Sequence, residues 1–131
     1  MPIQPAGAAG VRGTIVIDEK FRAGLRDLDG FSRIILIYAF DRSQGYELEV
    51  IPFLDTVPHG IFATRAPRRP NAIGITTVEL LGVEGNVLKV RGLDAIDGTP
   101  VIDIKPHFPQ FDAPAAVRCP GWVDRLMSGY F

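Results

Sequence analysis

The chain has 131 residues, with 14 Lys or Arg, 15 Asp or Glu and a net charge of −1. This length fits one domain with a substantial core and is too short for two. The charge balance argues against nonspecific binding along duplex phosphates, so any contact with nucleic acid must be local. A single cysteine, Cys119, excludes an internal disulfide, and His59 and His107 lack metal-ligand spacing, so we expect no metal.

The chain is expected to work in the cytoplasm, away from membranes. No apolar run approaches the length that spans a bilayer. The first residues, MPIQPAGAAG, lack the cationic start and the continuous apolar stretch of a signal peptide.

Fourteen glycines and eleven prolines divide the sequence into short segments, which favours a mainly β fold. Residues 13–17 read as a strand. Residues 18–28 carry the helix-like period of the chain, with Asp18 as a candidate N-cap. Residues 32–40 form a continuous β-branched and aromatic run, which predicts a buried strand. Residues 45–53 alternate polar and apolar side chains, which predicts a strand with one wet face.

The second half of the chain continues this pattern. HGIFAT, residues 59–64, is predicted as a strand that leads into an arginine-rich segment. Residues 73–81 and 86–92 predict two antiparallel strands joined by a turn with Gly and Asn. An alternating strand follows at 101–105. Beyond it, an aromatic tail, residues 113–131, contains an amphipathic piece. Exposed Trp122, Tyr130 and Phe131 would favour an oligomer interface over packing within the chain.

Two segments concentrate polar side chains. In GIFATRAPRRPNAIG, residues 60–74, three arginines lie around two prolines that stiffen the backbone. Such a segment is either a solvated turn or a preorganised site for anionic groups. In LDAIDGTPVIDIKP, residues 93–106, the DGTP turn needs no ligand to explain it, but its aspartates are candidates for proton transfer. The sequence contains no phosphate loop, no GxGxxG fingerprint and no GxSxG elbow, and it offers no evident covalent nucleophile.

Three motifs, LRDLDGFSRIILIY, FATRAPRRPNAIG and LDAIDGTPVIDIKP, together resemble the TsaA-like family, whose characterised members are S-adenosylmethionine-dependent methyltransferases of the TrmO type. The motifs occur in the family's order and the resemblance runs from about residue 13 to 106. It implies a small closed β-barrel in a single domain of residues 1–131, acting as a homodimer with the cofactor site near the subunit interface. The implied reaction is methyl transfer to N6 of threonylcarbamoyladenosine, beside the anticodon of tRNA.

Site residues carry over by motif. The implied cofactor contacts are Pro2, Ile3, Gln4, Asp41, Arg65, Ile75, Ile104, Lys105, Pro106 and His107. The implied catalytic residues are Asp94, Asp97, Asp103 and Asn71, with the three aspartates as alternative bases. Arg68 and Arg69 are assigned to phosphates of the anticodon loop. For Arg65, a bidentate clamp on the cofactor carboxylate is the physical rationale.

The chain also departs from the family pattern. It opens at MPIQPAG, without the family's first strand, and Ile3 stands where the family has an arginine. Asp41 replaces a histidine, Ala72 replaces the second proline of RPNP, and the C-terminal extension of longer members is absent. These departures bear on tRNA specificity more than on cofactor binding. A cofactor-binding or regulatory barrel without methylation activity is therefore the alternative function, and a structural interaction module is a third.

Overall fold

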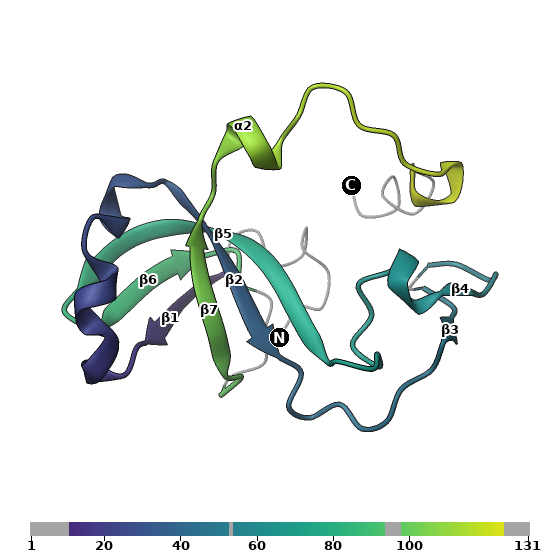
Figure 1. Cartoon of the computed structure of the whole chain (residues 1–131), viewed down its shortest axis with the longest axis horizontal. Helices are drawn as coiled ribbons and strands as arrows, with labels where there is room; N and C mark the ends of the chain where they lie inside the picture. The colour runs from purple at the N-terminus through teal and green to yellow at the C-terminus, as the bar shows by residue number, and fades with distance from the viewer. Residues whose placement is uncertain (1–10, 53, 94–97, 125–131) are drawn as a thin grey trace.

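A computed structural model describes residues 11–52, 54–93 and 98–124 (Figure 1). A five-stranded antiparallel sheet in the order β1-β6-β5-β2-β7 forms the body of the protein. A two-stranded sheet, β3-β4, stands apart from it as a small lobe. The strands are β1 (Arg12–Val16), β2 (Arg33–Ala39), β3 (Glu49–Val50), β4 (His59–Gly60), β5 (Ile73–Glu84), β6 (Val87–Arg91) and β7 (Val101–Pro106).

The core lies on one face of the large sheet. On β2 the alternate residues Ile34, Leu36 and Tyr38 are buried, while the residues between them are half-buried. Leu88 and Val90 on β6 are fully buried against them. Each such side chain contributes about 1.5–3 kcal/mol through removal from water. The predicted buried strand is therefore confirmed, and it lies between β5 and β7.

The β5–β6 hairpin is confirmed as antiparallel, and its turn is tighter than the sequence suggested. Strand β5 continues to Glu84, so that Gly85 and Asn86 alone make the turn. Gly85 takes φ +62°, a region open to glycine. Asn86 ties the turn to the end of β1: its side chain donates to the Ile17 carbonyl at 2.8 Å, and its own carbonyl accepts the Ile17 N–H at 2.8 Å.

The segment predicted as a helix over residues 18–28 forms two 3₁₀ helices instead, η1 (Glu19–Leu25) and η2 (Leu28–Gly30). Asp18 precedes η1 but makes no side-chain capping bond, and neither helix has a buried residue. Asp27, at φ +70°, breaks the segment between them. A segment this short buries too little apolar surface to hold an α-helix against the cost of ordering it.

The strands predicted at 45–53 and 59–64 shrink to the two-residue β3 and β4. Pro52 ends the first and Pro58 precedes the second, and proline cannot donate to a ladder. After β4 the backbone turns into a 3₁₀ helix, η3 (Ile61–Ala63). A two-stranded ribbon has no further strand to extend its pairing, so it stays short.

The C-terminal part arches from the large sheet to the small lobe (Figure 1). After β7 comes one turn of helix, α2 (Pro109–Asp112), and then residues 113–120, all of them exposed. Residues 121–124 are helical, and Trp122 stacks on His59 with ring centroids 3.8 Å apart. Trp122 is thus half-buried against its own chain, and the role of this tail in an oligomer interface stays a prediction. Tyr130 and Phe131 lie outside the described residues.

A mainly β fold is confirmed, whereas closure into a barrel is not. The described strands make a sheet whose edges are β1 and β7. No helix in the described residues combines the length and apolar character needed to cross a membrane.

Candidate functional site

Three motif segments meet at one end of the large sheet, where β2 ends and β5 and β7 begin. The antiparallel pairing places Ala39 opposite Ile73 of β5, and Tyr38 opposite Val101 of β7. Backbone bonds fasten the adjoining loops: the Phe40 N–H donates to Ala72 at 2.8 Å, and the Ala39 N–H donates to Pro100 at 3.0 Å. The arginine-rich segment, the Asp41 loop and residues 98–100 of the DGTP turn therefore share this end of the sheet.

Arg69 stabilises the arginine-rich segment from within. Its Nη1 donates to the carbonyls of Thr64, at 2.9 Å, and Ala66, at 3.1 Å. The Thr64 hydroxyl in turn donates to the Ile61 carbonyl at 2.9 Å. A neighbouring loop adds a bond from the Ser43 hydroxyl to the Pro67 carbonyl at 3.3 Å. Charged donors on carbonyls make stronger bonds than neutral ones, so the segment is rigid.

The three arginines therefore have different environments. Arg68 is about half exposed and forms an ion pair with Glu47 at 3.1 Å. An exposed pair of this kind contributes 0–1 kcal/mol, so Arg68 is readily released to another anion. Arg65 is exposed, and its guanidinium has no hydrogen bond or ion pair within the described part of the chain. Of the three, Arg65 is thus the cation most available to a ligand.

On β7, Asp103 and Lys105 lie on the outer face of the sheet and pair with each other at 2.9 Å. Hydrogen bonds from the Lys105 ammonium and from the Ile104 N–H hold the pKa of Asp103 below its usual range. A carboxylate so stabilised is a weak proton acceptor. Ile75 of β5 shares this outer face, because both it and Asp103 pair with Ile37 of β2.

The other predicted site residues are spread more widely. Ile104 packs toward the core, on the face opposite Ile75. His107 lies at the far end of β7, where its N–H donates to Arg33 at 3.1 Å. Asn71 and Asp41 are exposed near the shared sheet end. Pro106 is the last residue of β7. The remaining predictions lie outside the described residues: Pro2, Ile3, Gln4, Asp94 and Asp97.

A cluster of Asp55, His59 and Trp122 was not predicted. The Asp55 carboxylate is 3% exposed, accepts the N–H groups of Thr56 and Val57 through Oδ1, and bonds His59 Nε2 through Oδ2 at 2.9 Å. These bonds, that of Thr56 foremost, lower the pKa of Asp55, while desolvation opposes them. The sequence DTVPH, residues 55–59, could have indicated the turn at Asp55, since Asp often bonds the N–H groups that follow it, and this turn brings His59 close to the carboxylate. Nothing in the sequence indicates Trp122.

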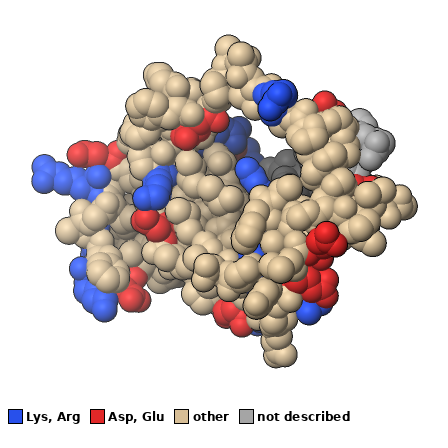
Figure 2. All heavy atoms as spheres, turned by 45° about the vertical axis from the view of Figure 1, so that its right-hand side comes forward, with Lys and Arg blue, Asp and Glu red and all other residues tan. Residues whose placement is uncertain are grey.

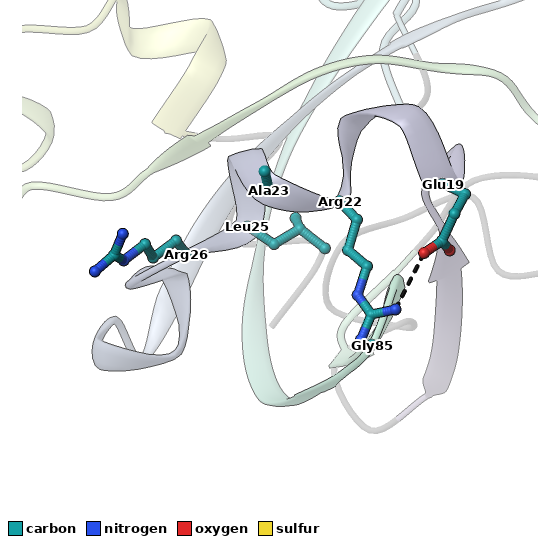
Figure 3. Close-up of a pocket in the computed structure, with 6 residues that line it drawn as sticks. All are labelled: Glu19, Arg22, Ala23, Leu25, Arg26 and Gly85. Atoms are coloured by element: carbon teal, nitrogen blue, oxygen red, sulfur yellow. Dashed lines mark hydrogen bonds and ion pairs between the residues drawn. The ribbon is translucent and has the colours of Figure 1, made fainter.

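Charge elsewhere is mixed. On the face in Figure 2, basic and acidic side chains are interspersed, without a continuous basic surface. A shallow depression of about 530 Å3 lies at η1, at the end of the molecule away from the small lobe (Figure 3). There Arg22 turns toward Glu19, which it contacts at 3.0 Å, and Arg26 points away. None of the predicted site residues lines it. Within the described residues there is no cluster of three metal-ligating side chains.

Comparisons with known proteins agree on one relationship. A family model described as the tRNA-methyltransferase O N-terminal domain matches residues 1–113. A probable S-adenosyl-L-methionine-binding protein of Pyrococcus abyssi is 46% identical over 125 residues, covering 95% of this chain and 67% of that protein. A tRNA (adenine(37)-N6)-methyltransferase of Mus musculus is 42% identical over 93 residues, covering 69% of this chain and 22% of that protein.

A solved structure of TrmO superimposes with a TM-score of 0.75 at 40% identity, over 90% of this chain and 53% of that one. The chain thus spans about half the length of that protein and about a fifth of the mouse enzyme. The family match, over residues 1–113, includes both the large sheet and the arginine-rich segment. The chain belongs to the family of the tRNA-methyltransferase O N-terminal domain.

Proposed function

We propose that this chain binds S-adenosylmethionine and methylates N6 of an adenosine in tRNA, the acceptor being threonylcarbamoyladenosine beside the anticodon. Arg65 carries the proposal: an exposed guanidinium with no described partner, on a segment made rigid by Arg69. Family membership supports it, since one relative is named as binding this cofactor and another as a tRNA adenine-N6 methyltransferase.

The residues present suit such a cofactor. Its amino-acid carboxylate matches the bidentate donor geometry of Arg65. Its adenine needs hydrogen-bond partners, which the free edge of β7 supplies. Because the His107 N–H bonds Arg33 across the β2–β7 pair, alternation turns the backbone of Ile104 away from β2. The Ile104 N–H donates to Asp103, so the Ile104 carbonyl is the group that remains for the adenine. Ile75 adds exposed apolar surface on the outer face.

Methyl transfer requires position more than a nucleophilic side chain. When bound, the cofactor would supply an electrophilic methyl group on a sulfonium for the acceptor nitrogen. The chain's own task is to hold the acceptor nitrogen in line and to take up the proton it loses. Asp103 is bonded to Lys105 and has a lowered pKa, so we favour Asp94 or Asp97 as the base. Asn71 is exposed near the same sheet end and is available to orient the acceptor.

Contacts with RNA are assigned to Arg68, whose ion pair with Glu47 is exposed and weak. We propose that Arg69 contributes to the same contact indirectly, by holding the segment in shape. Barrel closure and a homodimer complete the proposal. The homodimer is supported by apolar side chains on the large sheet, Ile73, Ile75 and Ile102, which are each 46–55% exposed.

A cofactor-binding barrel without methylation activity is the second candidate. It is favoured by the name of the Pyrococcus abyssi relative, which states cofactor binding alone. The two candidates differ in one reaction. Purified protein is incubated with methyl-labelled cofactor and bulk tRNA from a strain that lacks the modification. Label in tRNA at N6 of the modified adenosine supports the methyltransferase, while cofactor binding with no labelled tRNA supports the alternative. Absence of cofactor binding rejects both.

A further inference from the structure

Phe62, in the turn η3, is a large apolar side chain that lies exposed to solvent. It is 76% exposed, and its ring makes no ring contact with any described residue. Its neighbour Ile61 is 1% exposed. The turn η3 therefore fixes one side chain in the interior and directs the next outward. Exposed aromatic rings on a rigid turn are candidates for a binding function.

The backbone beneath Phe62 is held on both sides. The Ile61 N–H donates to Leu48 of the neighbouring segment at 2.9 Å, and the Thr64 N–H and hydroxyl both donate to the Ile61 carbonyl. Arg69 then holds the Thr64 carbonyl. A ring presented from such a turn loses little backbone freedom when a partner covers it.

Two arginines of the same segment follow Phe62 in the sequence. Arg65 comes three residues later with no described partner, and Arg68 has only its exposed pair with Glu47. A segment that carries both an exposed aromatic ring and exposed guanidinium groups suits single-stranded nucleic acid, whose bases stack on the ring while phosphates meet the cations. A symmetric contact with a second copy, centred on Phe62, would instead bring the same arginines of two chains together.

We propose that Phe62 is a platform on which a nucleobase of single-stranded RNA stacks. This role of Phe62 rests on the proposed RNA acceptor, whose single-stranded loop would contact the ring.

The test measures binding of a fluorescently labelled RNA hairpin with a single-stranded loop, by anisotropy. Phe62→Ala weakens binding by about 5- to 150-fold, the effect of losing one stacked base. Phe62→Trp binds RNA as tightly as the wild type, because tryptophan also offers a π-face. Phe62→Leu binds as weakly as Phe62→Ala, because leucine is apolar but has no π-face. Phe111→Ala is the matched control: Phe111 is 79% exposed on α2, and its loss leaves the affinity at the wild-type value. Salt dependence separates phosphate contacts from base stacking. Arg68→Ala lowers the slope of affinity against salt concentration, whereas Phe62→Ala leaves this slope unchanged.

Four results would overturn the platform. Wild-type affinity in Phe62→Ala, or full recovery in Phe62→Leu, rejects stacking while leaving the proposed methyltransferase intact. A change in molar mass of Phe62→Ala by light scattering shows that the ring joins two chains instead. If the wild-type protein binds no RNA, the RNA acceptor fails as well. Calorimetry with S-adenosylhomocysteine on the same samples then shows whether cofactor binding survives that failure.

Discussion

Gly74 lies where β5 passes beneath two aromatic rings. A Cβ built there would meet Tyr38 Cε2 and Phe40 Cζ, each at 2.7 Å. The two rings pack edge to face, with centroids 5.4 Å apart, so neither can move without disturbing the other. The glycine of the RPNAIG motif is therefore explained by packing, because a larger residue would collide with these two rings at the end of the sheet where the motif segments meet.

Gly74→Ala is expected to destabilise the protein by about 1–3 kcal/mol, the usual cost of overpacking a core. Urea denaturation measures it. Gly60→Ala is the control, because Gly60 has φ −59° and open space around its Cα. Equal stability of Gly74→Ala and the wild type would show that the rings yield easily.

Asp55 gives the small lobe a pH-dependent stability. Its pKa in the folded protein is below the ordinary value of an aspartate, so its carboxylate stabilises the fold fully above the unfolded pKa, and this contribution fades as pH falls through the folded pKa. Asp55→Asn should thus be less stable than the wild type near neutral pH. The gap should narrow below about pH 4. Urea midpoints across this range measure it, and a gap that stays constant down to pH 3 would contradict the assignment.

At the scale of elements, the C-terminal segment is attached to the small lobe through a stack of Trp122 on His59. Trp122 is the single tryptophan of the chain, so its fluorescence reports on this attachment. An aromatic pair of this kind contributes about 0.5–1.5 kcal/mol. Its loss lowers the ratio of C-terminal segments docked on the small lobe to undocked ones by about 2- to 12-fold.

His59→Ala should therefore make Trp122 more accessible to acrylamide quenching. His107→Ala provides the control, since His107 lies at the end of β7, whereas Trp122 stacks on His59. Unchanged quenching in His59→Ala would mean that the segment is held by other contacts.

Elements with a strong local pattern were predictable from the sequence. The apolar run that became β2 and the hairpin of β5 and β6 each bury one face against the other strands, so local pattern and packing agree. The segments at 18–28, 45–53 and 59–64 carry similar patterns, but Ile61 is their one fully buried side chain among the described residues, and so they shorten or become 3₁₀ turns. The Asp55–His59–Trp122 cluster joins parts of the chain that only the fold brings together.

For the whole molecule, the order of strands explains how distant motifs share one site region. β2 ends where β5 and β7 begin, so the Asp41 loop, the arginine-rich segment and the DGTP turn converge although they are far apart in sequence. The sequence motifs assign residues of all three segments to one site. It did not predict that the three arginines would differ, because their roles depend on nearby carbonyls and on Glu47.

The most direct test of the central claim is calorimetry of S-adenosylhomocysteine binding to the wild type, Arg65→Ala and Arg68→Ala. The wild type should bind, and Arg65→Ala should bind about 10- to 150-fold more weakly, because a hydrogen bond to a charged group contributes about 1.5–3 kcal/mol. Arg68→Ala should match the wild type, since its role is assigned to RNA. No binding by the wild type, or equal affinity of Arg65→Ala and the wild type, would contradict the account.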